Sequence, residues 1–182
     1  MNEDERDRMC VERCLRGDSR AFEEILDRYE KPVYNAILRL GAGRDDARDV
    51  SQQVFMKVYE RLDSYDPAHR FFSWLYRVAI NETINHLKSN RTWEPLSATF
   101  EDQHPDPEQQ LEAAEEERTM QNALMALDLK YRLALIVRHF LHLSYEEAAD
   151  VLSVPVKTVK SRLFTARQLL REVIEGSRHA AR

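Results

Sequence analysis

The sequence predicts an all-α protein built from two small helical domains. Only 4 of its 182 residues are glycine, although phosphate-binding loops and tight two-residue hairpins depend on glycine. This scarcity disfavours nucleotide-binding α/β folds and all-β sandwiches. Hydrophobic residues make up 43% of the chain and charged residues 32%, which is enough for a core beneath a heavily charged surface. Apolar residues recur at helical spacing on both sides of one polar segment.

Charge divides the chain into three parts, for which we expect boundaries at 1–92, 93–117 and 118–182. The middle part holds nine acidic residues, no lysine or arginine, and three of the six prolines. It lacks the apolar residues to offset its ordering entropy, so we interpret it as an acidic flexible linker. An acidic strand that occupies a basic channel on a partner is the alternative. The last part carries eleven Lys or Arg against six acidic residues, so the overall charge of −5 does not exclude a nucleic-acid partner.

In the first domain, helical periodicity predicts three helices. The first spans about 22–40, with a kink or restart at Pro32. The second begins at Asp45 or Asp46 as N-cap and ends near Leu62, with Phe55 and Tyr59 beside its apolar face. The third runs from about Arg70 to Lys88, after a loop over 62–69. On the second helix, a polar face has no evident local role; it consists of Asp46, Asp49, Gln52 and Gln53.

The third helix carries a stripe of cations, amides and one aromatic ring. Its members are spaced by three or four residues and share one face: Arg70, Trp74, Arg77, Asn81, Asn85 and Lys88. Cations track phosphates, a ring stacks on a base, and amides bond exposed base edges. The stripe therefore predicts a site for single-stranded nucleic acid. For Trp74 a place in the core is an equal alternative.

The second domain has the pattern of a helix-turn-helix. Asp128 is expected to cap a helix, and Ser144 with Glu147 forms a capping box before a short helix that includes Ala148 and Ala149. A longer helix follows from about Val156 to Glu175, with a buried seam and a basic polar face. That face predicts binding in the major groove of DNA, through Lys157, Thr158, Lys160, Ser161, Arg162, Phe164, Arg167 and Arg171.

Three stretches together resemble the extracytoplasmic-function (ECF) group of bacterial sigma factors. They are Asp46–Phe55, Phe72–Asn81, and Leu143–Ala149 continued by Val154–Leu163. The resemblance covers about residues 15–92 and 118–175. It implies a non-enzymatic subunit that directs RNA polymerase core to promoters, assists promoter melting and answers stress.

The resemblance also assigns tasks to the predicted surfaces. The first domain would be sigma region two, with Asp46, Asp49, Gln52 and Gln53 on the beta-prime clamp and the stripe on the −10 strand. Residues 63–70 would surround an extruded −10 base. The second domain would be region four, on the −35 duplex and the beta flap, and the linker would thread toward the RNA exit channel. Because the chain ends soon after Arg178, we expect control by a separate anti-sigma factor.

Two other kinds of protein would share parts of these patterns. A stand-alone helix-turn-helix regulator would bind duplex DNA as a dimer, and a sensor would use Cys10 and Cys14 or the pair His139 and His142. We expect the thiols to be reduced bystanders and the histidines to be surface or packing residues. No catalytic set, metal or cofactor is expected. The charged N-terminus and the lack of a long apolar run predict a cytoplasmic chain without secretory signal or membrane insertion.

Overall fold

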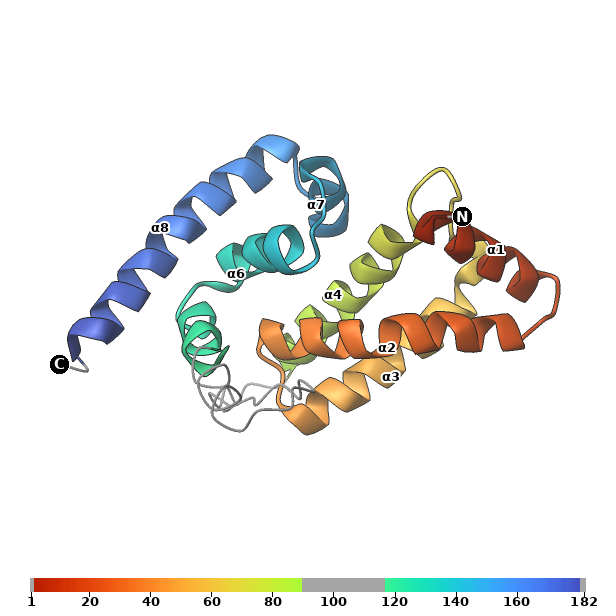
Figure 1. The fold of residues 1–182 in the computed structure, drawn as a ribbon, viewed down its shortest axis with the longest axis horizontal. Helices are drawn as coiled ribbons and strands as arrows, with labels where there is room; N and C mark the ends of the chain where they lie inside the picture. Colours follow the sequence, from red (N-terminus) through yellow and green to blue (C-terminus); the bar gives the residue numbers. More distant parts are fainter. Residues whose placement is uncertain (1, 90–116, 181–182) are drawn as a thin grey trace.

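The computed structural model describes residues 2–89 and 117–180, and every regular element in these ranges is helical. The N-terminal lobe contains α1 (Glu3–Leu15), α2 (Arg20–Leu40), α3 (Arg44–Glu60), a short 3₁₀ turn (Leu62–Ser64) and α4 (Phe71–Ser89). The C-terminal lobe contains a helix over 117–125, α6 (Leu129–Leu135), a π-helical turn (Ile136–Phe140), α7 (Tyr145–Leu152) and α8 (Val156–Ala180). Figure 1 shows the two lobes side by side. The predicted all-α fold is confirmed, while most of the predicted linker lies outside the described residues.

Helix α1 was not predicted, because it has little apolar periodicity. Only Asp7, Cys10 and Val11 are buried along it. Its start is nevertheless well defined: the Asn2 side chain accepts from the Glu5 amide at 2.8 Å, and the Glu5 carboxylate accepts from the Asn2 amide at 3.0 Å. Such a reciprocal capping box satisfies two of the free amides of the first turn. Helix α1 is thus fixed by its cap and by a buried polar contact, in which the Arg28 guanidinium and the Tyr29 hydroxyl donate to Asp7.

The boundaries of α2 and α3 bear on two sequence-based expectations. Helix α2 is continuous through Pro32, so the restart there was wrong, and Pro32 lies on the exposed side of the helix. Helix α3 has Gly43 as N-cap, without a side-chain hydrogen bond, so capping by Asp45 or Asp46 was wrong. Both carboxylates lie in the first turn instead, where the positive end of the helix dipole stabilises negative charge.

The helix-turn-helix of the C-terminal lobe forms as predicted. The Glu147 amide donates to the Ser144 hydroxyl at 3.1 Å, and the Ser144 amide donates to the Glu147 carboxylate at 2.8 Å. Ala148 and Ala149 are buried, as are the first three members of the α8 seam, Val159, Leu163 and Ala166. Small side chains at this crossing let α7 approach α8 closely. The other sequence-based cap, Asp128, occupies the N-cap position of α6 without a side-chain hydrogen bond.

The two lobes share a hydrophobic core. Leu40 of α2 and Ile80 of α4 belong to the same buried cluster as the apolar residues of the C-terminal lobe, among them Leu124, Leu133 and Ile136. Phe72 and Leu141 pack against the clusters of both lobes. Because burial of apolar surface is the main favourable term in packing, this shared cluster stabilises the association of the lobes.

Arg132 is a buried cation at the same junction, with a side chain only 2% exposed. Its guanidinium donates to the carbonyl oxygens of Leu124, Met125 and Leu127, and to that of Leu40 at 2.6 Å. Burial lowers the pKa of Arg132 to about 10, so the group stays charged at neutral pH. One side chain thus joins the turn before α6 to the end of α2.

Candidate nucleic-acid interface

Helix α8 presents a continuous exposed basic face. Lys157, Lys160, Arg167 and Arg171 are exposed along it, and so is Ser161. The Phe164 side chain is 63% exposed on this face, which is unusual for a large aromatic ring. Of the remaining predicted residues, Thr158 and Arg162 are half-buried. The structure therefore places the predicted set on one helix whose opposite side is buried in the lobe core.

Aromatic and histidine side chains border this basic face. The Lys160 ammonium lies 5.1 Å from the centroid of the Tyr145 ring, within the range of a cation–π contact. The Arg167 guanidinium lies 3.2 Å from Nε2 of His139. Burial, with the charges of Arg167, Arg138 and His142, lowers the pKa of His139. The imidazole is therefore neutral at physiological pH, and its Nε2 can accept from Arg167 and orient it.

Helix α4 carries the predicted single-strand stripe. Arg77, Asn81, Asn85 and Lys88 are exposed along it, and Arg70 is exposed immediately before its first residue. All five polar members of the stripe are thus accessible to a partner.

Trp74, the aromatic member of the stripe, lies in the core. Its side chain is 7% exposed, and its ring centroid lies 5.7 Å from those of Tyr65 and Phe71. Of the two alternatives at this position, the structure thus shows the packed one. Stacking on a base would need the ring to become more exposed than it is here.

The segment before α4 forms a structured rim around a cavity of about 510 Å³. The Tyr65 hydroxyl donates to the His69 carbonyl at 2.7 Å, and the Ala68 amide donates to the Asp66 carboxylate at 2.9 Å. Trp74 and Arg77 of α4 line the same cavity. Its other wall comes from the C-terminal lobe, through Glu146, Glu147, Asp150 and Val151 of α7.

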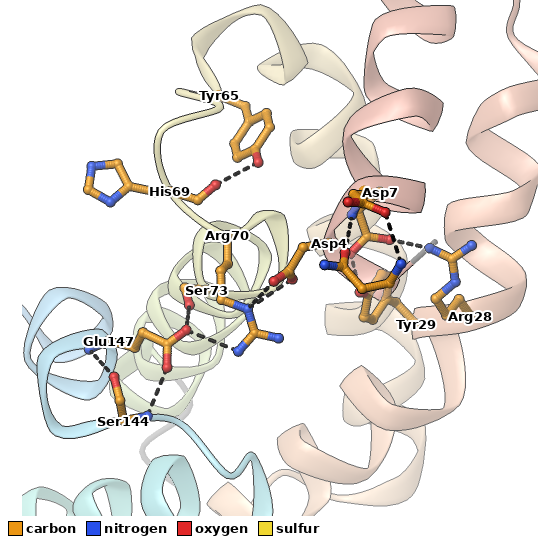
Figure 2. A network of polar contacts seen from close by, with 12 residues as sticks. Asp4, Asp7, Arg28, Tyr29, Tyr65, His69, Arg70, Ser73, Ser144 and Glu147 are labelled. Atoms are coloured by element: carbon orange, nitrogen blue, oxygen red, sulfur yellow. Dashed lines mark hydrogen bonds and ion pairs between the residues drawn. The ribbon is translucent and has the colours of Figure 1, made fainter.

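Arg70 lies at the centre of a polar network that joins the lobes (Figure 2). It donates to the Asp4 carboxylate at 2.9 and 3.0 Å and to Glu147 at 3.2 Å. The Ser73 hydroxyl donates to the same Glu147 oxygen at 3.1 Å. The pKa of Arg70 is raised, mainly by its hydrogen bond to Asp4. Burial works against the charge of Glu147, but the hydrogen bonds from Ser144 and the charge of Arg70 hold its pKa below the usual value.

A second surface, a groove of about 1240 Å³, lies between α2 and α3. Gln52 lines it, together with Arg48 and the ring of Tyr34. Asp49 and Gln53 are exposed elsewhere on α3, whereas the Asp46 carboxylate lies 3.3 Å from Nε2 of His86 on α4. The four predicted contact residues of α3 are therefore not all in one place: one lines the groove and one faces α4.

Sequence reasoning missed the apolar part of this groove. Met56 is 63% exposed and Tyr59 49% exposed, and both line it. Helical periodicity places Tyr59 beside the buried face of its helix; the residue instead stands at the rim, with its ring 5.0 Å from that of Phe22. The available signal was Met56 one turn before Tyr59, with both outside the apolar seam of Val50, Val54 and Val58, because large apolar side chains outside the core mark interaction surfaces.

The structure also describes the thiols that a sensor would need. Burial raises the pKa of both Cys10 and Cys14, and Cys10 also donates to the Glu24 carboxylate. Thiols of raised pKa are poor nucleophiles and poor metal ligands. Within residues 2–89 and 117–180, no group of three or more His, Cys, Asp or Glu side chains is arranged to hold a metal ion. Within the same ranges, no helix has the length and apolar character to cross a membrane.

Comparison with known proteins decides the family. The profile of sigma-70 region 2 matches residues 25–92, and that of sigma-70 region 4 matches residues 117–170. The RNA polymerase sigma-H factor of Pseudomonas aeruginosa is 35% identical to this chain, over 94% of the chain and 95% of its own length. The ECF RNA polymerase sigma-E factor of Haemophilus influenzae is 30% identical over 93% of the chain and 95% of its own length. The chain belongs to the ECF sigma factors. It therefore acts in transcription initiation and is not an enzyme.

Other relatives of this sigma factor agree in sequence and in fold. The ECF RNA polymerase sigma-E factor of Escherichia coli K12 is 32% identical over 93% of the chain and 95% of its own length. The structure of CnrH in complex with the cytosolic domain of CnrY superimposes with a TM-score of 0.74 at 26% identity, covering 94% of this chain and 98% of that one. The sigma factor RpoE of Bartonella quintana, solved with the anti-sigma factor NepR, shares the fold with a TM-score of 0.70 at 23% identity.

Proposed function

We propose that this sigma factor divides promoter recognition between its two lobes. Residues 118–182 read the −35 duplex, and residues 1–92 hold the −10 strand and dock on the polymerase core. Residues 93–117 connect the two as an acidic linker that runs toward the RNA exit channel. The observation that carries this proposal is the pair of exposed polar faces, one on α8 and one on α4, each on a helix whose opposite side is buried.

The −35 assignment is supported by the chemistry of the α8 face. Lys160 and Arg167 can donate to guanine O6 and N7 or to phosphate, and Ser161 can bond either type of base. The exposed ring of Phe164 suits the methyl group of thymine. Lys157, Thr158, Arg162 and Arg171 flank these residues and supply further contacts to the backbone.

The −10 assignment is supported by the exposed amides of α4. Asn81 and Asn85 can bond the edges of unpaired bases, while Arg77 and Lys88 follow the phosphates. The cavity bordered by Tyr65, His69 and Trp74 suits a base turned out of the stack. Captured bases would offset the cost of unpairing, which is about a few kcal/mol per base.

The groove between α2 and α3 supports docking on the beta-prime clamp. Its combination of the exposed Met56 and Tyr59 with charges of both signs is typical of protein interfaces. Gln52 offers a polar contact in the groove, and we propose that Asp49, Gln53 and Asp46 add contacts from the neighbouring surface of α3. We propose that region four also rests on the beta flap, as in the family.

Regulation by an anti-sigma factor is the remaining part of the proposal. The similar sigma factor RpoE was solved with the anti-sigma factor NepR, and CnrH with CnrY. We propose that a separate protein of that kind holds this chain inactive until stress releases it. A stand-alone helix-turn-helix regulator is disfavoured, because it leaves the groove and the α4 face of the N-terminal lobe without a task.

Two single substitutions test the roles of the two lobes separately. Asn81→Ala should allow closed complexes but reduce strand opening, since an amide that bonds unpaired bases is lost. Lys160→Ala should weaken formation of the closed complex itself and leave association with core polymerase unchanged. Permanganate footprinting and co-purification with core report the two steps.

Glu23→Ala, an exposed change on α2, serves as the control for both. Footprints of Asn81→Ala equal to those of wild type would reject the −10 assignment. Loss of core binding in Lys160→Ala would reject the −35 assignment.

A further inference from the structure

One cavity wall has no role in the functions assigned so far. The cavity around Tyr65, His69 and Trp74 is closed from the other lobe by α7, whose Glu146, Glu147 and Asp150 face it. The residues on the two sides come from opposite lobes, and the surface that α7 covers is the one proposed above for the −10 strand. The inference that follows therefore rests on the proposed function.

The contact across this cavity is specific and charged. Glu147 accepts from Arg70 at 3.2 Å and from Ser73 at 3.1 Å, both from the N-terminal lobe. Arg70 is one of the cations predicted to meet the phosphates of the −10 strand. The Glu147 carboxylate therefore satisfies a donor that the proposed function assigns to a DNA phosphate.

The Glu147 side chain is also held by a contact within its own lobe. Its carboxylate already accepts from the Ser144 amide in the capping box, which aims the side chain away from α7 and toward α4 (Figure 2). A side chain held in one rotamer loses little entropy on making a further contact. The capping box therefore prepares the residue for the contact between lobes.

A second set of contacts holds the opposite end of the lobe interface. The Gln121 amide donates to the Leu38 carbonyl at 3.0 Å, Arg132 donates to Leu40, and Arg39 pairs with Glu117 at 2.5 Å. These contacts gather where α2 ends, whereas the Glu147 contact lies at the start of α4 (Figure 1). Separation at the Glu147 end would uncover the cavity while the other end keeps its contacts.

We propose that α7 is an internal inhibitor of the −10 site: in the free chain, Glu147 occupies Arg70 and Ser73 in place of promoter DNA. The basic face of α8 stays exposed in this closed form, so the −35 surface remains available. Docking on polymerase, or DNA that competes for Arg70, then opens the chain at α7.

The matched variant is Glu147→Gln. Glutamine is accepted at the third position of a capping box, so the start of α7 is retained while the charge that pairs with Arg70 is removed. Ser73→Ala removes the second donor to Glu147 and leaves the capping box of Ser144 and Glu147 unchanged. Glu172→Gln, an exposed change of equal charge on α8, controls for net charge, and circular dichroism confirms that each variant is folded.

Two measurements on the full chain test the proposal. Small-angle scattering of the free protein should give a compact wild type, near about 16 Å for a globular chain of this length, and a larger radius of gyration for Glu147→Gln and Ser73→Ala. Fluorescence anisotropy should show about two- to fivefold tighter binding of the non-template −10 strand, the range expected from loss of a partly exposed ion pair. Binding of the −35 duplex should be unchanged. The promoter used is one mapped by transcription with the wild-type chain.

The two measurements together decide whether α7 inhibits the −10 site. An unchanged radius and unchanged strand affinity in both variants would overturn the proposal, and so would an extended wild type. Expansion without a gain in strand affinity would overturn the claim that α7 covers the −10 site. Failure of the wild type to support transcription would reject the proposed function, but the scattering result would still report on closure.

Discussion

At the scale of single residues, a few buried polar side chains determine how the chain is held together. Arg132 donates to four backbone carbonyl oxygens, and three of them lie in the one turn before α6. Sequence reasoning did not identify this role, because a lone arginine in an apolar stretch indicates only an amphipathic helix. Its function depends on carbonyl oxygens that only the folded chain brings together.

Arg132→Ala should lower the free energy of unfolding by about 3 kcal/mol, since several buried acceptors lose their donor. The stability of Arg132→Lys should fall between those of wild type and Arg132→Ala, because one ammonium cannot reach all four oxygens. Urea denaturation measures the effect. The exposed Arg118→Ala should stay within about 0.5 kcal/mol of wild type, and an equal loss at both positions would contradict the role given to Arg132.

At the scale of elements, local signals predicted some helices well and others poorly. The capping box of Ser144 and Glu147 and the apolar seam of α8 rest on short-range physics, so both were predicted from sequence. Helix α1 was missed because it is stabilised by Asn2 and by the buried contact of Asp7 with Arg28 and Tyr29, rather than by an apolar face.

The turns after α1 and α2 provide a matched pair of glycines. Gly17 has φ +98° and open space where a Cβ would stand, while a Cβ at Gly41, with φ +110°, would lie 2.9 Å from Nη1 of Arg132. Gly17→Ala should cost about 1–2 kcal/mol of stability from backbone strain alone. Gly41→Ala should cost more and also expand the free chain, as seen by denaturation and scattering. Equal effects at the two sites would contradict a junction held by Arg132.

The α8 face gives a prediction about salt. Lys160→Ala should lower the slope of log affinity against log salt for promoter DNA by about 1, because one phosphate contact is lost. Ser161→Ala should leave that slope unchanged and alter base preference at one −35 position. Titrations of holoenzyme binding at several salt concentrations distinguish the two. A slope that does not change in Lys160→Ala would place that ammonium away from the backbone.

At the scale of the whole molecule, the sequence predicted two helical domains but not their association. Arg70 and Glu147 are 77 residues apart, and each was explained locally, one as a strand-binding cation and the other as a cap. Periodicity assigns a residue to a face of its own helix, and it carries no information on which face of another lobe will meet it. The α2–α3 groove was likewise largely missed, since only Gln52 of the four predicted polar residues lines it and its exposed apolar residues drew no attention.

The most direct test of the central claim is transcription-start mapping on genomic fragments with RNA polymerase core, with and without this chain. We expect new starts that depend on the chain and share sequence at both −35 and −10, with the −35 signal weakened by Lys160→Ala and opening weakened by Asn81→Ala. Starts that are unchanged by adding the chain, together with no association with core, would contradict the account.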